Sequence, residues 1–318
     1  MTVSRHSVAI LGATGHVGKC LTASLLARGE HDVTAIARSS ERLEMFLDRL
    51  PAGDRVARRS FAEFPHGEYD VVVNCVGVRN SADAPPAGVS IFALTEQFDA
   101  VVMDYIEGRP DTLYVAFSSG AAYCGAFSSP ADENSPAIVN INAIVPTDYY
   151  GVAKLASEVK HRAAADLAIV DLRLFGLFSR YSDLSAPYFM NDVYGALAQD
   201  SVLKVGPEDM TRDYIDPDDM TALLVAVIGA GPHNDVYDLY SAAPVAKFDV
   251  LEGFSARYGL KYDVLDSPMA PTSTGMKPGY YSTNRRAATL GYEPARTSMQ
   301  SLAREMDALL QLHEGGRA

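Results

Sequence analysis

The sequence predicts an α/β protein with a doubly wound parallel sheet and a small C-terminal lobe. In the first half of the chain, short apolar runs alternate with stretches of helical periodicity. The run Tyr69–Val76 is almost continuously apolar, which is typical of a strand in a parallel sheet that helices cover on both faces. Strands and helices that alternate at this spacing form right-handed βαβ units. Together these observations favour a parallel sheet between two layers of helices.

Each expected element follows from its own local pattern. The expected strands are bounded apolar runs, at Ser7–Leu11, Asp32–Ala37, Tyr69–Val76, Leu113–Phe117 and Ala168–Leu174. The expected helices carry apolar residues at helical spacing, at Val17–Ala27, Phe92–Glu107, Tyr150–Ala165 and Arg296–Leu312. Ser179–Lys204 is mixed, and Pro268–Tyr281, rich in Pro, Thr, Ser and Gly, is expected to be a loop.

The length of 318 residues suits one large α/β unit with a lobe. No long linker or repeat divides the chain. We expect residues 1–175, together with a return at 213–240, to form the sheet domain. Residues 176–212 and 241–318 are expected to form a lobe over the carboxyl edge of the sheet, where such sheets bind ligands.

Charge and cysteine content narrow the classes of partner and compartment. Lys and Arg number 27 against 40 Asp and Glu, a formal net charge of −13, so nucleic acid and anionic membranes are not expected partners. The three cysteines lie far apart without a CxxC spacing, which favours a reducing compartment and no metal site. No signal-peptide pattern or long apolar span is present, so we expect a cytoplasmic protein.

A glycine-rich motif, GxxGxxG over Gly12–Gly18, follows the first strand and begins the first helix. In this setting the glycines allow a tight turn and a close approach of the backbone to a pyrophosphate, which the helix N-terminus stabilises. The motif therefore predicts a Rossmann-type dinucleotide site. The residues expected to contact the dinucleotide here are Gly12, Thr14, Gly15, His16, Val17 and Gly18.

The end of the second strand bears on the choice of dinucleotide. An NAD site has an acidic residue there to bind the ribose 2′-hydroxyl, but this chain has Arg38 followed by Ser39 and Ser40. A guanidinium with two hydroxyls suits a 2′-phosphate, so NADP(H) is favoured and NAD(H) is the other candidate.

A tyrosine and a lysine are placed to share one helix face. Tyr150 and Lys154 are four residues apart, so the phenol and the ammonium can point into one pocket, whereas Tyr149 would pair with Ala153. A nearby ammonium lowers the pKa of a tyrosine and makes it a better acid–base group. Ser118 and Ser119 follow the strand Leu113–Phe117, and a hydroxyl there can hold a substrate oxygen during proton transfer.

Taken in order, these motifs resemble the extended short-chain dehydrogenases/reductases, including the NAD(P)-dependent epimerase/dehydratase family that acts on nucleotide sugars. The resemblance runs from about Val8 to the final helix. It is carried by GATGHVG, FSSGAAY, YGVAK, DLRLFG, TRDYIDPDD and LGYEP.

The resemblance implies roles for individual residues. Tyr150 corresponds to the catalytic acid/base, Lys154 to the lysine that binds the ribose, and Ser119 to the active hydroxyl, four residues before Tyr123. Cys124 interrupts the usual Tyr-Gly, so an alignment anchored on Gly125 would place Gly120 there, and Ser118 is the other candidate hydroxyl. The implied cofactor contacts after the fourth strand and near the nicotinamide are Cys75, Val76, Gly77 and Phe175. The implied substrate contacts are Ser119, Gly176, where the family often has Asn, and Arg212, which reaches the substrate's diphosphate.

Two features of the sequence bear on the choice of reaction: the residues after the active hydroxyl, and Arg38. The Asp-Glu pair of the dehydratases is absent, because Gly120-Ala121 stands there. Arg38 argues for NADPH, so the sequence favours an NADPH-dependent reductase of a keto group on a nucleotide-activated sugar. An NAD(P)-dependent nucleotide-sugar epimerase is the alternative enzyme, and a catalytically silent NADPH-sensing protein is the alternative outside catalysis. A homodimer formed through a helix pair is the assembly usual for the superfamily.

Overall fold

The computed structural model describes residues 4–77, 91–125, 127–267 and 277–315. A seven-stranded sheet of parallel strands lies at its centre in the order β3-β2-β1-β4-β5-β6-β9. The strands are β1 (Ser7–Leu11), β2 (Asp32–Ile36), β3 (Ala57–Arg59), β4 (Val71–Asn74), β5 (Leu113–Ser119), β6 (Ile169–Leu174) and β9 (Asp235–Asp238). The doubly wound sheet predicted from the sequence is therefore confirmed.

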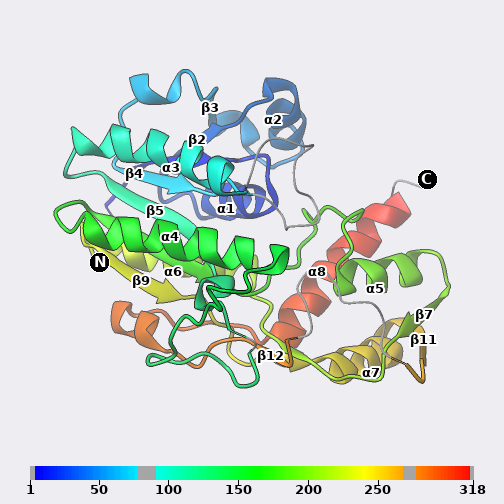
Figure 1. The fold of residues 1–318 in the computed structure, drawn as a ribbon. Coiled ribbons are helices and arrows are strands. Elements are labelled where there is room, and N and C mark those ends of the chain that lie inside the picture. Colours follow the sequence, from blue (N-terminus) through cyan, green and yellow to red (C-terminus); the bar gives the residue numbers. More distant parts are fainter. Residues whose placement is uncertain (1–3, 78–90, 126, 268–276, 316–318) are drawn as a thin grey trace.

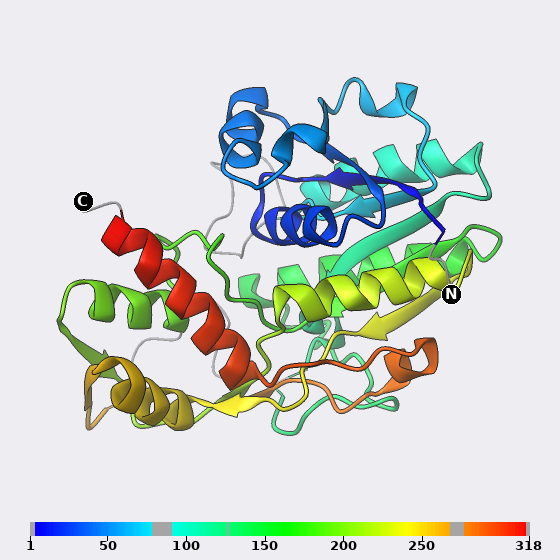
Figure 2. The same cartoon turned by 180° about the vertical axis from the view of Figure 1, so that it is seen from behind.

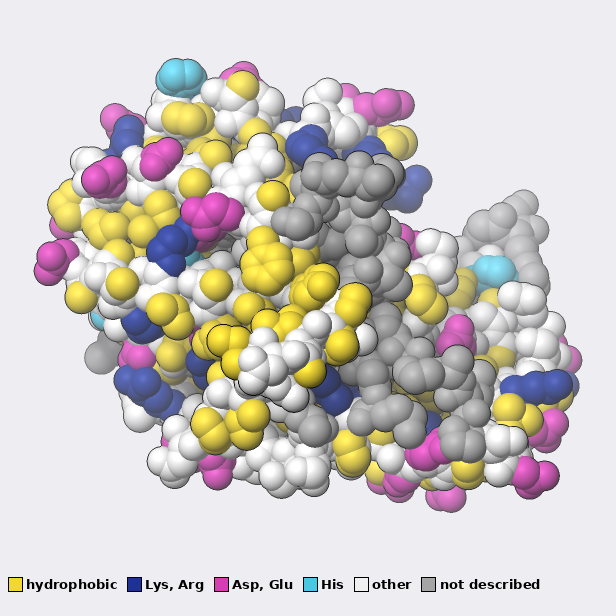
Figure 3. Space-filling view, in the orientation of Figure 1, with side chains coloured by type: hydrophobic (Ala, Val, Ile, Leu, Met, Phe, Trp, Pro, Cys, Tyr) yellow, Lys and Arg dark blue, Asp and Glu magenta, His cyan; other side chains and the backbone are white. Residues whose placement is uncertain are grey.

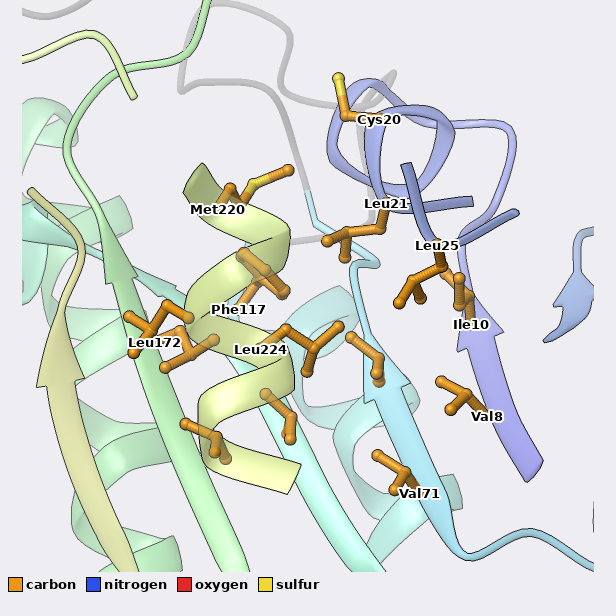
Figure 4. Close-up of a cluster of buried hydrophobic side chains, with 14 of the residues drawn as sticks. Val8, Ile10, Cys20, Leu21, Leu25, Val71, Phe117, Leu172, Met220 and Leu224 are labelled. Atoms are coloured by element: carbon orange, nitrogen blue, oxygen red, sulfur yellow. The ribbon is translucent and has the colours of Figure 1, made fainter. Parts of the chain in front are cut away.

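Helices cover both faces of this sheet (Figures 1 and 2). These helices are α1 (His16–Arg28), α2 (Ser40–Leu47), α3 (Ile91–Glu107), α4 (Tyr149–Ala163) and α6 (Pro217–Gly229). Alternate strand residues point to opposite faces, so Ile10 packs with α1 and α6, whereas Leu11 packs against α3. Figure 4 shows the α1/α6 side, where Leu21 and Leu224 meet the sheet.

A buried polar network fastens α3 and α4 to the sheet. His161 of α4 is 1% exposed, and its ring nitrogens lie 2.8 Å from carboxylate oxygens of Asp99 on α3 and Asp171 on β6. Burial alone would lower the pKa of His161, but hydrogen bonds and charges of the two aspartates outweigh burial and raise it to about 9. The imidazolium then donates from both nitrogens, which fixes α4 relative to β6.

The remaining helices and strands form a smaller lobe beside the carboxyl edge of the sheet, at the lower right of Figure 1. They are α5 (Phe189–Ala198), β7 (Val202–Val205), β8 (Thr211–Arg212), β10 (Val245–Ala246), α7 (Lys247–Tyr258), β11 (Lys261–Val264), β12 (Gly279–Tyr280) and α8 (Ser298–Gly315). These elements share an apolar core that two separate stretches of the chain build together. Met190 of α5 comes from the stretch before α6, and Phe254 of α7 and Leu302 of α8 come from the stretch after β9. Ala287 and Tyr292, by contrast, pack into the core of the sheet domain.

Two parts of the second half differ from the sequence expectations. The mixed stretch Ser179–Lys204 contains helix α5 and most of β7. Pro268–Tyr281, expected to be a loop, ends in strand β12, which pairs with β8; residues 268–276 lie outside the described residues. A two-residue strand has no periodicity to detect, and its pairing with β8 depends on tertiary structure.

Candidate active site

The glycine loop lies between β1 and α1 and leaves little room for a side chain at Gly12 or Gly18. Gly12 has φ +78°, and its N–H donates to the carbonyl of Ile36 at 3.0 Å. A Cβ on Gly18 would lie 2.3 Å from the carbonyl oxygen of Gly12. Three glycines thus bring the loop backbone and the start of α1 together, and the exposed helix N-terminus there suits a pyrophosphate. This cradle fits the dinucleotide predicted from the sequence.

The other residues of this loop have different roles in the fold. Thr14 is half-buried and Gly15 is exposed at the start of α1, while Val17 packs against the core. His16 turns its side chain toward the lobe, where Nε2 lies 2.8 Å from Ser179 Oγ. Burial lowers the pKa of His16 to about 4, so this imidazole is neutral at neutral pH.

Arg38 is exposed at the carboxyl end of β2 and has no ion pair or hydrogen bond with the described part of the chain. Ser39 beside it caps α2, because its Oγ accepts a hydrogen bond from Arg42 N at 3.2 Å. Cys75 and Val76 follow β4 beside Gly12, since a Cβ on Gly12 would contact both, and Gly77 comes next. These predicted cofactor residues therefore follow strands β2 and β4 at the same edge of the sheet as the glycine loop.

The two serines at the end of β5 point to different partners. Ser118 Oγ donates to the carboxylate of Glu158, which Arg173 also binds, so this hydroxyl belongs to a buried ion-pair network. Ser119 Oγ accepts from Ala121 N at 3.2 Å and lies 3.2 Å from the hydroxyl of Tyr280. Adjacent strand residues face opposite sides, so only Ser119 stands toward the lobe.

Helix α4 carries Tyr150 and Lys154 on the side that faces β5. Lys154 is 9% exposed, and its Nζ donates to the carbonyl of Phe117 at 2.8 Å. A Cβ on Gly151 would lie 2.5 Å from the carbonyl of Ala121, so the first turn of α4 packs closely behind the serines. Tyr150 is half-buried, whereas Tyr149 is 40% exposed. Tyr150 and Lys154 are thus brought to the carboxyl end of β5.

Phe175 and Gly176 follow β6 at the same edge. The ring of Phe175 packs against Gly120, where a Cβ would lie 2.4 Å from it. Gly176 lies against the main chain of Asp213, and a Cβ there would lie 2.6 Å from the carbonyl oxygen of Asp213. The main chain of Asp213 therefore leaves no room for a side chain at residue 176.

Arg212, on β8 of the lobe, is buried without a carboxylate partner among the described residues. Its Nη1 donates to main-chain carbonyls of Thr211 and Lys277, and its Nη2 has no partner within that part of the chain. Burial lowers the pKa of Arg212. Asp213 instead accepts hydrogen bonds from Ser241 and Ser298. The uncompensated cation suits an anionic ligand.

Two neighbours of Arg212 were not expected from the sequence. Lys277 places its ammonium 4.7 Å from the centre of the Tyr280 ring, and burial lowers its pKa, with the charge of Arg212 adding to the effect. Tyr280 is 6% exposed. Neither residue carries a sequence signal, because both stand in a stretch whose composition resembles a loop.

The glycine cradle, the serine after β5 and the tyrosine–lysine pair on α4 together define an enzyme of the extended short-chain dehydrogenase/reductase type. Residues 8–239 match the NAD dependent epimerase/dehydratase family, and the chain belongs to this family.

Similar solved structures share this fold over almost their whole length. The UDP-glucuronic acid 4-epimerase of Bacillus cereus, solved with UDP-glucuronic acid and NAD, is 18% identical with a TM-score of 0.78, covering 96% of this chain and 99% of that chain. The UDP-glucose 4-epimerase of Bifidobacterium longum, solved with NAD+ and UDP, is 19% identical with a TM-score of 0.75 and coverage of 96% and 98%. The corresponding enzyme of Stenotrophomonas maltophila, solved with NAD, is 15% identical with a TM-score of 0.80 and coverage of 98% and 99%. Comparison with curated proteins finds no match.

The described residues contain neither a membrane span nor a metal-binding cluster. None of the helices there is long and apolar enough to cross a membrane. No group of three or more His, Cys, Asp or Glu side chains within those ranges is arranged to hold a metal ion.

Proposed function

We propose that the protein is an NAD(P)-dependent epimerase of a nucleotide-activated sugar. One observation supports this most: the tyrosine–lysine helix and Ser119 stand at the carboxyl edge of the sheet opposite Arg212, which has no carboxylate partner among the described residues. This arrangement supports a role in proton transfer for Tyr150, Lys154 and Ser119, and a role for Arg212 in binding an anionic diphosphate. The family to which the chain belongs includes enzymes of this kind.

The glycine loop of Gly12, Gly15 and Gly18 would hold the dinucleotide, which would supply reversible hydride transfer at a sugar carbon. Tyr150 takes the proton from the sugar hydroxyl as the carbon is oxidised, and gives it back when the keto group is reduced. Lys154, whose ammonium is held at the carboxyl end of β5 by the carbonyl of Phe117, binds the nicotinamide ribose. Ser119 donates a hydrogen bond to the same sugar oxygen, and Arg212 holds the diphosphate.

Net reduction of a keto sugar by NADPH is the second candidate, and Arg38 supports it. The sequence by itself favours this reductase, because the basic residue Arg38 stands where NAD enzymes have an acidic residue. The similar structures support epimerisation better, since they are epimerases solved with NAD. NADP(H) as the preferred dinucleotide stays a prediction.

A single set of incubations separates the candidates. The enzyme is incubated with UDP-glucose, UDP-glucuronic acid or UDP-N-acetylglucosamine and a trace of NAD+ or NADP+, and the products are separated by chromatography. An epimerase forms the epimer without net change in cofactor. A parallel incubation contains NADPH and a nucleotide keto sugar, and there a reductase oxidises NADPH in proportion to the keto sugar added. A cofactor sensor binds the dinucleotide and catalyses neither reaction.

The proposed homodimer has a candidate surface. Exposed apolar side chains precede and begin α4, among them Ile141, Ile144, Val145 and Tyr149. Figure 3 shows hydrophobic side chains gathered over that end of α4. A second copy packed there would cover them, and light scattering of the wild type against Ile141→Asp tests this. The cytoplasmic location stays a prediction.

A further inference from the structure

Tyr280 brings a hydroxyl from the lobe to the active serine. The residue lies on β12, and its ring packs 4.8 Å from the ring of Phe127 and 5.3 Å from that of Phe175, measured between ring centres. Its hydroxyl lies 3.2 Å from Ser119 Oγ, although 161 residues separate the two in sequence. Because aromatic neighbours hold the ring, the position of this hydroxyl is fixed.

The hydrogen-bonding capacity of Ser119 limits what that contact can do. A serine hydroxyl has one donor and two acceptor positions. The Ala121 N–H fills one acceptor position at 3.2 Å. If the Tyr280 hydroxyl fills the other, the only group of Ser119 without a partner is its own proton.

The direction of the Ser119–Tyr280 hydrogen bond follows from the chemistry of the two groups. A phenol is far more acidic than an aliphatic alcohol, so in such a pair the phenol is the better donor and the alcohol oxygen the better acceptor. Burial raises the pKa of Tyr280, so Tyr280 keeps its proton.

We propose that Tyr280 is a positioning residue for the reaction: its hydroxyl donates to Ser119 Oγ and directs the proton of Ser119 toward the reacting oxygen of the sugar. Tyr280 transfers no proton itself, and no bond to it is made or broken. The inference rests on the proposed function, since it requires Ser119 to contact the substrate. It also makes the orientation of the active hydroxyl depend on the lobe, from which Tyr280 comes.

A double-mutant cycle tests this role, with steady-state kcat and KM measured on the nucleotide sugar identified by the incubations. Tyr280→Phe removes one oxygen and keeps the ring, so we expect kcat to fall about tenfold, with KM and the melting temperature close to wild type. In the Ser119→Ala background the same change should have no further effect, because Tyr280 acts through Ser119. Tyr281→Phe, one residue further on and half-buried, is the matched control and should leave kcat unchanged.

The outcomes distinguish this inference from the proposed function. An unchanged kcat in Tyr280→Phe, or an equal loss with and without Ser119, overturns the positioning role alone. A rise in KM without a fall in kcat also overturns it, because the ring would then only shape the sugar pocket. Wild-type turnover in Ser119→Ala contradicts the proposed chemistry itself.

Discussion

Nη1 of Arg212 donates a hydrogen bond to the main-chain carbonyl of Lys277 at 2.6 Å, and this contact holds the guanidinium in the lobe without neutralising it. No carboxylate of the described residues pairs with it, so the charge stays uncompensated at 9% exposure. The arrangement predicts that the cost of burying Arg212 is offset when an anionic ligand binds.

Arg212→Met should therefore weaken UDP binding by about tenfold or more, without lowering the melting temperature. Methionine fills a similar volume and removes a desolvated charge. Calorimetry with UDP and thermal unfolding measure the two effects. Arg180→Met is the control, because Arg180 pairs with buried Glu305 at 2.8 Å; it should lose stability and keep UDP affinity. The opposite result for Arg212 would assign it a structural role.

Arg38→Ala should weaken NADPH binding and leave NADH binding unchanged. A charge-assisted hydrogen bond to a 2′-phosphate contributes about 1.5–3 kcal/mol, or roughly ten- to over a hundredfold in affinity. Arg38 is exposed, so the change should not alter the fold. Dissociation constants for both dinucleotides measure the effect, and equal affinities in the wild-type protein would show that Arg38 does not select the cofactor.

Tyr150→Phe should reduce turnover by roughly 10²- to 10⁴-fold, the usual contribution of general acid–base catalysis. Lys154→Ala should be worse, because it also removes a cofactor contact and the bond to the carbonyl of Phe117. Tyr149→Phe is the control and should be nearly silent, since Tyr149 is the preceding residue of α4 and is 40% exposed. Steady-state rates with the true substrate give the comparison, and wild-type turnover in Tyr150→Phe would exclude this tyrosine as the proton donor.

Ser118→Ala and Ser119→Ala should have opposite effects. Loss of the Ser118 hydroxyl leaves Glu158 with one donor fewer in a buried network, so stability should fall by about 1–3 kcal/mol while kcat is kept. Ser119→Ala should keep stability and lose turnover. Urea unfolding and kinetics on both variants decide which serine is the active hydroxyl.

His161 should make stability depend on alkaline pH. Its pKa of about 9 in the folded protein lies above the ordinary value of 6.5, so the contribution is complete below about pH 6.5 and lost as pH rises through about 9. This contribution of His161 to the free energy of unfolding is on the order of 3 kcal/mol. The difference in unfolding free energy between wild type and His161→Gln should shrink across that window. A difference that stays constant would mean that the imidazole is neutral in the folded protein.

The sequence predicts the sheet well because its strands are locally marked. Ser7–Leu11 is an apolar run that ends at a glycine, and β1 has these bounds. The polar β3 is short and half-exposed, so no run of apolar residues marks it. Candidate site residues could be proposed in advance where they adjoin such marked elements, as with the glycine loop before α1 and Tyr150 in the first turn of α4.

The lobe side of the site could not be predicted in the same way. Tyr280 reaches Ser119 only because β12 pairs with β8, and a two-residue strand has no periodic pattern. The choice between Ser118 and Ser119 depends on which face of β5 each occupies, and the Glu158 partner of Ser118 lies 40 residues away. Such contacts are fixed by tertiary packing and leave no local trace in the sequence.

The apolar core of the lobe, shared by two separate stretches of chain, limits how this enzyme can be recombined with relatives. Met190 lies between β6 and β9 in sequence, and Leu302 lies beyond β9, yet both belong to that core. A chimera that exchanges only one stretch would leave half of an interlocked core facing a foreign surface. Transfer of substrate preference therefore needs both stretches to be exchanged together, the one between β6 and α6 and the one after β9, with the sheet and its dinucleotide cradle left as the host.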